Sequence, residues 1–149
     1  MGSLEFSILT LLVLGAVVKP WTVMAVAEQG SKDEPGIMSV ILRIQNDLGP
    51  GIKLHSHCRS ADTDIGNHEL DNSQNYQWSF NNSWLGNTLF WCSMKWNNVQ
   101  GSFDVYSFKR DFAKCVYCYW SIRQDGAYCY RLTPDITKFT WQLMYSWKK

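Results

Sequence analysis

The chain has 149 residues, of which 46% are hydrophobic and 18% are charged, and its net charge is +1. One domain is the normal organisation at this length, and the hydrophobic content excludes a disordered chain. So small a net charge gives no global field that would attract nucleic acid or anionic lipid.

The N-terminus has the pattern of an export signal. Residues 6–18 form an apolar run of the length of a signal-peptide core, too short to span a bilayer, which takes about 20 apolar residues. Ala25-Val26-Ala27 is a small-x-small cleavage site, so we expect a signal peptide over 1–27, cleaved after Ala27. A signal anchor is the alternative, but Lys19-Pro20 interrupts the longer span it would need. The mature protein is then expected to be secreted and free of the membrane.

Along the mature chain, polar residues 28–38 predict a flexible N-terminal tail, and residues 39–149 a single domain. Alternating apolar residues predict strands over 39–46 and 52–58. The turn between them contains two glycines and a proline that cannot donate to a sheet. We therefore expect these two strands to form a hairpin.

The next segment predicts two more strands. A polar loop over 59–66 is followed by a short edge strand at 68–70, and residues 76–80 alternate aromatic and polar side chains as a strand does. Asn81-Asn82-Ser83 then forms an N-glycosylation sequon in a turn, so we expect a glycan on Asn81.

Further strands are predicted over 88–96, 103–108, 116–122 and 128–132, with an Asp-Gly hairpin turn before the last. The C-terminal segment at 136–147 fits two structures, because its aromatic residues alternate as in a strand but also recur at helical spacing. Its composition favours the strand. Seven to eight short strands separated by turns predict an all-β fold, an antiparallel β-sandwich.

Five cysteines lie beyond the cleavage site, in a chain directed to an oxidising compartment: Cys58, Cys92, Cys115, Cys118 and Cys129. Four can pair as two disulfides, which leaves one over. The Cys-x-x-Cys at 115–118 has the spacing of a redox motif, but such motifs begin a helix and this one opens an aromatic strand. We therefore expect the disulfides to be structural.

Seven short motifs occur in the order found in one family: Asn46-Asp47-Leu48-Gly49, His57-Cys58-Arg59-Ser60, Asp62-Thr63-Asp64-Ile65-Gly66, Tyr76-Gln77-Trp78-Ser79-Phe80, Thr88-Leu89-Phe90-Trp91-Cys92, Cys115 to Ile122, and Asp125-Gly126. With these motifs the chain resembles the plant self-incompatibility proteins, or S-protein homologues, from about Val40 to Tyr128. Cys129 is a departure, because it lies outside the four cysteines of the family pattern.

The resemblance implies a secreted β-sandwich with two disulfides. In the best-known members of the family the protein is a ligand that engages a pollen surface receptor. We therefore expect an extracellular signalling ligand that binds a cell-surface receptor, with no cofactor. A lectin-like carbohydrate-binding β-sandwich is the alternative, because exposed aromatic rings suit stacking on sugars.

The pairing of the four family cysteines stays open at this point. If the strands over 88–96, 102–108 and 115–123 form a meander, Cys92 and Cys118 lie two strands apart, about 9–10 Å, which is too far for a disulfide. Cys58 would then cross the sandwich to Cys92, with a local Cys115–Cys118 bridge if Cys115 lies in a bend. The rival pairing joins Cys58 to Cys118 and Cys92 to Cys115. Cys129 is the unpaired candidate and is free, buried, or bridged to a second chain as a covalent dimer.

The sequence shows no catalytic constellation. The set His55, His57, His68, Asp62 and Asp64 could be assembled into a metal site, but an exposed polar face explains these residues better. We find no nucleophile with a matched base and no pair of carboxylates placed around a glycosidic bond. We therefore predict no metal and no enzyme activity.

Recognition is expected on the loops that a rigid sandwich presents. The candidate loops are Arg59 to Gly66, Trp96 to Gly101 and Lys109 to Lys114. A second possibility is a binding patch of outward aromatic residues, since Tyr and Trp dominate interface hot spots. Those residues are Trp91, Tyr117 and Tyr119.

Overall fold

The structure is a computed structural model that describes residues 38–148. The predicted signal peptide over 1–27, its cleavage after Ala27, and the predicted tail up to residue 37 lie outside the described residues. Within 38–148, no helix is long and apolar enough to cross a bilayer.

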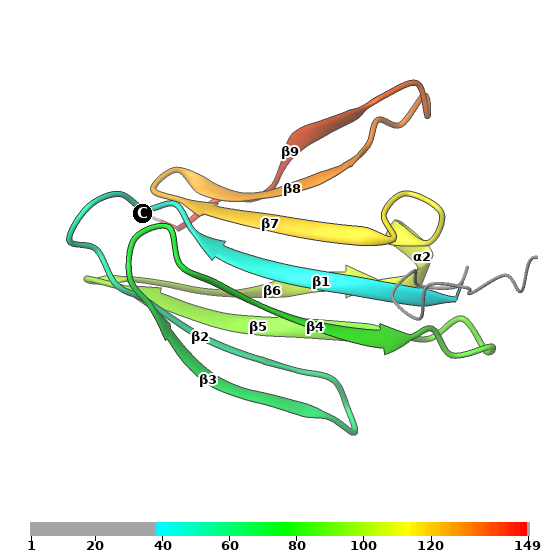
Figure 1. The fold of residues 1–149 in the computed structure, drawn as a ribbon, viewed down its shortest axis with the longest axis horizontal. Coiled ribbons are helices and arrows are strands. Elements are labelled where there is room, and N and C mark those ends of the chain that lie inside the picture. Colours follow the sequence, from blue (N-terminus) through cyan, green and yellow to red (C-terminus); the bar gives the residue numbers. More distant parts are fainter. Residues whose placement is uncertain (1–37, 149) are drawn as a thin grey trace, which may run out of the picture. The chain divides into compact units, whose positions relative to one another are not determined.

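Residues 38–148 form nine strands and one short helix, which confirms the all-β prediction (Figure 1). The C-terminal segment is a strand, as its composition favoured. The elements in chain order are β1 (Ser39–Asn46), β2 (Leu54–Arg59), β3 (Asp64–Leu70), β4 (Asn75–Asn81), β5 (Leu89–Trp96), β6 (Val99–Ser107), α2 (Phe108–Asp111), β7 (Tyr117–Arg123), β8 (Gly126–Leu132) and β9 (Phe139–Tyr145).

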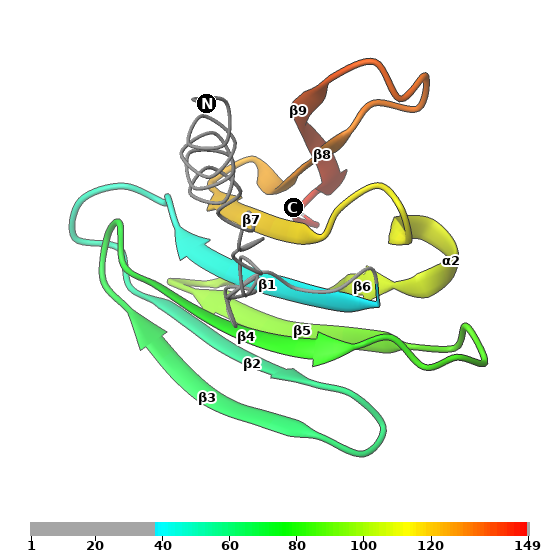
Figure 2. The same cartoon turned by 45° about the vertical axis from the view of Figure 1, so that its right-hand side comes forward.

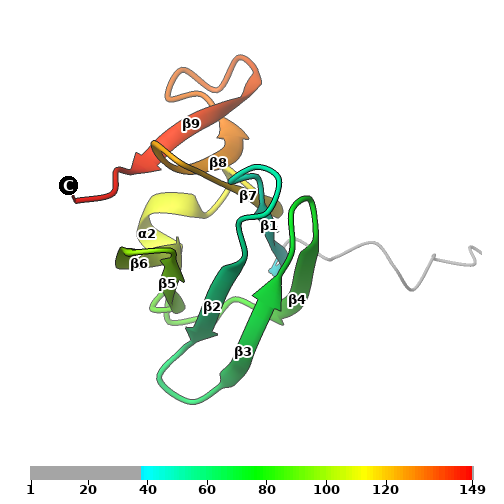
Figure 3. The same cartoon turned by 90° about the vertical axis from the view of Figure 1, so that its left-hand side faces the viewer.

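The strands form two sheets that face each other across one core (Figure 3). The five-stranded sheet has the order β4-β1-β7-β8-β9, and the four-stranded sheet has the order β3-β2-β5-β6. Neighbouring strands are antiparallel, except that β1 and β7 run parallel. The predicted sandwich is therefore confirmed, with one parallel pair that the sequence did not reveal.

Two expected strand pairings are wrong. The strands β1 and β2 do not form a hairpin, because the turn over 47–51 carries the chain from one sheet to the other. The expected meander is also interrupted: β5 and β6 pair, but α2 and the turn after it lead the chain across to β7 in the other sheet (Figure 2). In strands such as β1 and β5 the alternating apolar residues mark the inner face, and both sheets share one core, so alternation does not tell which sheet a strand joins.

The core is filled by inner side chains of both sheets. The five-stranded sheet contributes Val40, Leu42, Ile44, Cys118, Trp120 and Ile122, and the four-stranded sheet contributes Leu54, Phe90, Cys92, Met94 and Val105. The indole N–H of Trp120 donates to the carbonyl of Val105 at 3.0 Å. This hydrogen bond satisfies the polar atom of a fully buried ring and ties the two sheets together.

Aromatic contacts close the two sides of the sandwich. On one side, Tyr76 of β4 stacks on His68 of β3 with ring centroids 3.7 Å apart. Burial raises the pKa of Tyr76 to about 12. On the other side, Tyr145 and Trp147 pack against Gly101 of β6, where an added Cβ would lie 2.9 Å from the Tyr145 ring. Only glycine therefore lets the C-terminal segment approach β6 this closely.

Candidate functional site

The structure contains two disulfides, Cys58–Cys92 and Cys115–Cys118, which is the first of the two pairings that the sequence left open. The first bridge takes a different path from the one expected. It does not cross the sandwich but joins directly opposite residues of the neighbouring strands β2 and β5. The second bridge closes the bend before β7, with Cα atoms 5.1 Å apart. All four cysteines are buried, which suits a scaffold role.

Cys129 on β8 is unpaired and buried. Burial raises the pKa of its thiol to about 12, and the Asp111 carboxylate acts in the same direction. Asp111 is itself buried and contacts both Arg131 and Arg110 at 2.7 Å, an ion-pair cluster that joins α2 to β8. An intermolecular disulfide at Cys129 would therefore require this part of the sandwich to open.

The residues weighed as a metal site do not converge. His57 on β2 contacts Asp64 at 2.6 Å, whereas His68 stacks on Tyr76 at the side of the sandwich. Asp62 is held in its own loop by the hydroxyl of Ser60 at 2.8 Å. Across residues 38–148, no group of three or more His, Cys, Asp or Glu side chains is placed to hold a metal ion.

The Asp62-to-Gly66 motif orders the β2–β3 turn. The hydroxyls of Ser60 and Thr63 both donate to the Asp62 carboxylate. These hydrogen bonds lower the pKa of Asp62, and that from Ser60 has the larger effect. Hydrogen bonds from His57 and from the N–H of Gly66 lower the pKa of Asp64. The motif is therefore a self-contained turn that favours ionised carboxylates.

The Asn46-Asp47-Leu48-Gly49 motif is also structural. The buried Asn46 amide donates to the carbonyls of Ile52 and Leu70, both at 2.8 Å, and accepts from the N–H of Leu48 at 2.9 Å. It thereby fixes the connection between the two sheets.

The three loops predicted for recognition are partly built into secondary structure and keep exposed positions, among them Asp62, Thr63, Asn97, Asn98 and Lys109. Much of 59–66 belongs to β2 and β3, and 96–101 is the tight β5–β6 hairpin. The segment 109–114 contains the end of α2, which the buried Asp111 anchors. Recognition by these loops stays a prediction, and a second candidate surface lies on a sheet.

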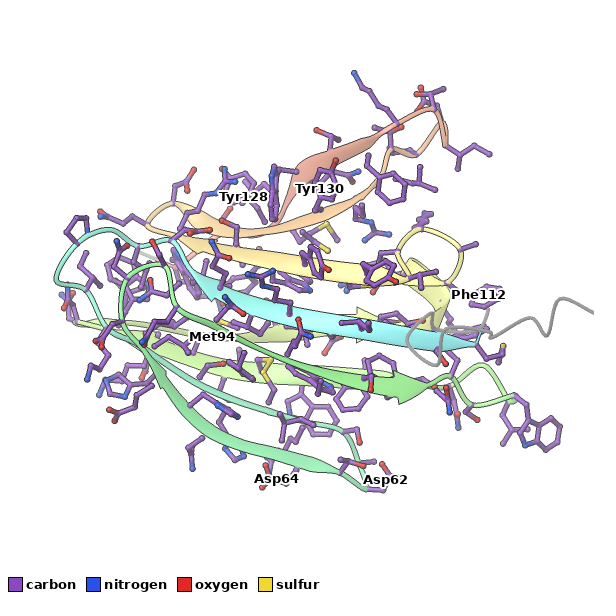
Figure 4. The ribbon with its side chains drawn as sticks, viewed as in Figure 1. Asp62, Asp64, Met94, Phe112, Tyr128 and Tyr130 are labelled. Carbon is purple, nitrogen blue, oxygen red and sulfur yellow. A yellow bond between two sulfur atoms is a disulfide. The ribbon has the colours of Figure 1, made fainter. Side chains whose placement is uncertain are left out.

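The outer surface of the five-stranded sheet carries exposed aromatic side chains, which we call the aromatic face. Cross-strand register places Tyr119 of β7 opposite Tyr130 of β8, which lies opposite Trp141 of β9. Figure 4 shows Tyr128 and Tyr130 on the side of β8 turned away from the four-stranded sheet. Trp141 is 42% exposed and Phe139 is 49% exposed. The full set is Tyr117, Tyr119, Tyr128, Tyr130, Phe139, Trp141 and Leu143.

Two arginines lie against these rings. The guanidinium of Arg123 is 4.3 Å from the Tyr128 ring centre and 5.4 Å from that of Trp141. The guanidinium of Arg43 is 5.5 Å from the Tyr119 ring centre. Arg43 donates to Gln45, and its Nε is buried without a partner among the described residues. The face therefore combines apolar rings with cationic donors that are not fully used.

A groove of about 430 Å³ crosses one end of the aromatic face. Its walls are Tyr117, Tyr119, Tyr130, Phe139 and the bend over 113–116. The Cys115–Cys118 bridge closes that bend and so holds one wall in place. The groove is suited to accept an apolar side chain of a partner.

Sequence reasoning identified only part of this face. Tyr117 and Tyr119 were expected to point outward and do so, whereas Trp91 lies on the outer surface of the opposite sheet. The rings of β9 were missed because alternating apolar residues normally mark the inner face of a strand, whereas in β9 Phe139 and Trp141 are exposed and Thr140 and Gln142 are half-buried. β8 offered no usable signal, because its buried side chains are smaller or more polar than the outward Tyr128 and Tyr130: Ala127, Cys129 and Arg131.

Two further features lie near the end of β4. The side chain of Asn81 is exposed. Its side-chain oxygen accepts a hydrogen bond from the Ser39 hydroxyl at 2.6 Å, and its side-chain nitrogen makes no hydrogen bond within residues 38–148. A glycan on Asn81 stays a prediction. Trp84, in the connection from β4 to β5, is 87% exposed.

Comparison with known proteins decides the family. The family model for plant self-incompatibility protein S1 matches residues 41–147. The chain belongs to this family. S-protein homolog 2 of Arabidopsis thaliana is 38% identical over 113 residues, which are 72% of this chain and 68% of that protein. S-protein homolog 29 of the same plant is 40% identical over 87 residues, 58% of this chain and 64% of that protein, so the match spans just under two thirds of its length.

A solved structure has the same fold. It belongs to the Self-Incompatibility Protein Homologue proteins, described as a widespread family of small, highly stable, secreted proteins from plants. The two structures align with a TM-score of 0.54 and 19% identity, over 76% of this chain and 98% of that one. The family resemblance expected from the seven motifs is therefore confirmed, and so is the two-sheet fold.

Proposed function

We propose that this chain is a secreted plant protein that acts as an extracellular signalling ligand, binding a cell-surface receptor through its aromatic face. Support for secretion comes from the predicted signal peptide, the two disulfides, and a family whose solved representative is described as secreted. The titratable groups described above have structural partners, such as Asp111 with Arg131 and His57 with Asp64, so we assign them no catalytic role.

The composition of the aromatic face carries the receptor proposal. Tyr, Trp and Arg are the residue types enriched among interface hot spots, and here they lie together on one surface. Arg123 is already positioned by Tyr128 and Trp141, so it would lose little freedom on binding. The underlying strands are held by the core and by the Cys115–Cys118 bridge, which preorganises the surface further.

A cell-binding measurement tests this proposal. Labelled mature protein should bind intact plant cells saturably, and protease treatment of the cells should abolish the part of this binding that depends on the aromatic face. Trp141→Ser should weaken binding by about 2 kcal/mol, which is a roughly 30-fold change. The matched variant Trp84→Ser removes a more exposed tryptophan outside the aromatic face and should keep the affinity. Equal losses from both variants, or no loss from Trp141→Ser, would contradict the proposal.

The second candidate function is a lectin-like carbohydrate-binding module. The observation that favours it is the row of exposed rings on an outer sheet face, including Tyr130 and Trp141, whose centroids are 5.3 Å apart. On a glycan array, this function predicts strong binding of a defined sugar that Trp141→Ser abolishes. Cell binding would then survive protease treatment and be lost to the competing sugar.

A further inference from the structure

The outer surface of the four-stranded sheet differs from the aromatic face, because it is polar and hollowed. The hollow has a volume of about 570 Å³ and takes side chains from all four strands. The register sets them in two rows, with His55 beside Lys95 in one and Asn67, His57, Ser93 and Ser102 side by side in the other. Neighbours in a row repeat at the strand spacing of about 4.8 Å, which gives a regular array of hydrogen-bonding groups.

The hollow also has a net positive lining. Lys95 and Lys148 line it without a carboxylate partner among the described residues, and no Asp or Glu side chain belongs to the lining. Acidic groups flank the hollow on two strands. On β6, the exposed Asp104 lies two residues beyond Ser102 and outside the lining. On β3, Glu69 contacts His55 at 3.2 Å and Asp64 contacts His57 at 2.6 Å. These contacts hold the two imidazoles and leave Lys95 as a free cation on the open sheet.

We infer that this hollow binds an acidic oligosaccharide, a chain of sugar units that carry carboxylates. Lys95 makes a charge-assisted contact to a carboxylate, and Asn67, Ser93 and Ser102 exchange hydrogen bonds with the sugar hydroxyls. Two other ligands would use the hollow less fully. A neutral sugar would leave the charge of Lys95 without a partner, and a free phosphate ion would leave the row of hydroxyl and amide groups without hydrogen bonds. The site lies on the sheet opposite the aromatic face, so the inference does not rest on the proposed receptor function.

Titration calorimetry with three probes tests the inference: an oligogalacturonide, a neutral galactose oligosaccharide of the same length, and inorganic phosphate at matched ionic strength. The oligogalacturonide should bind saturably, and more weakly as salt is added. Lys95→Gln removes one charge-assisted contact and should weaken binding about tenfold. The matched variant Lys138→Gln makes the same charge change at an exposed position between β8 and β9 and should leave binding unchanged.

Nuclear magnetic resonance locates the bound probe. The oligogalacturonide should shift the ring signals of His55 and His57 and leave the indole signal of Trp141 in place. Any of four results would overturn the inference. These are no saturable binding of the oligogalacturonide, equal binding of the neutral probe, displacement by phosphate, and equal losses from the two lysine variants. Trp141→Ser should lose cell-receptor binding and keep oligogalacturonide binding, so failure of one proposal is distinguishable from failure of the other.

Discussion

At the scale of single residues, buried polar side chains fix the connections that the hydrophobic core cannot specify. The amide of Asn46 is the main example, because it makes three hydrogen bonds to the backbone where the chain changes sheets. Leaving buried backbone partners unsatisfied costs about 1–3 kcal/mol for each group. The family motif that contains Asn46 therefore has a folding role.

We predict that Asn46→Ala lowers the free energy of unfolding by about 3 kcal/mol, because it orphans two carbonyls and one N–H. Asn72→Ala, which changes an exposed asparagine in the β3–β4 turn, should change it by less than about 0.5 kcal/mol. Denaturant unfolding measures both variants. Similar values for the two would show that the Asn46 amide does not secure the crossover.

The Cys129 thiol should be unreactive in the folded protein. A pKa of about 12 keeps it protonated near neutral pH, and only the thiolate is an effective nucleophile. Iodoacetamide should therefore modify Cys129 after unfolding and not before, and a non-reducing gel should show monomer. Rapid alkylation of the native protein, or a band at twice the monomer mass that Cys129→Ser removes, would refute this expectation.

At the scale of elements, strand positions could be predicted from the sequence and sheet membership could not. The alternation in 76–80 is regular and that in 39–46 is broken only at Ile41, and both segments are strands close to the expected bounds. The path of the chain depends on tertiary contacts that leave no local signal, such as the Asn46 amide at the first crossover. Cys58 and Cys92 form one of the two pairings that the sequence left open, and they are neighbours within one sheet because β2 pairs with β5 and not with β1.

The two disulfides should differ in their effect on stability. In the chain-entropy account, stabilisation grows with the length of chain that a bridge closes. The sequence separation is 34 for Cys58–Cys92 and 3 for Cys115–Cys118. Replacing the first pair by alanines should cost about 4 kcal/mol and replacing the second about 2 kcal/mol. Thermal or denaturant unfolding compares the two variants, and a larger loss from the Cys115–Cys118 pair would contradict this account.

The β2–β3 turn should weaken in acid. The pKa values of Asp62 and Asp64 are lower in the folded protein than their ordinary value of 3.8. Their contribution to stability is therefore present above that value and is lost as pH falls through the lowered folded values. Unfolding measured from about pH 5 to about pH 2 should show this loss, with a shallower slope for Asp64→Asn. An unchanged slope in that variant would contradict the role of the carboxylate.

At the scale of the whole described domain, one shared core supports two outer surfaces of different chemistry. The five-stranded sheet presents rings and arginines, and the four-stranded sheet presents amides, hydroxyls, imidazoles and lysines. The two disulfides and the Asp111–Arg131 pair keep these surfaces rigid without using either of them. A protein built this way can engage a receptor on one side and an acidic glycan on the other.

Site-directed photo-cross-linking on intact plant cells tests the receptor surface most directly. A photoreactive side chain at position 139 lies on the aromatic face, and one at position 93 lies on the opposite sheet. We predict a protease-sensitive adduct of higher mass from position 139, which excess unlabelled protein suppresses, and no protease-sensitive adduct from position 93. A protease-sensitive adduct formed from position 93 and absent at position 139 would contradict the assignment of the aromatic face as the receptor-binding surface.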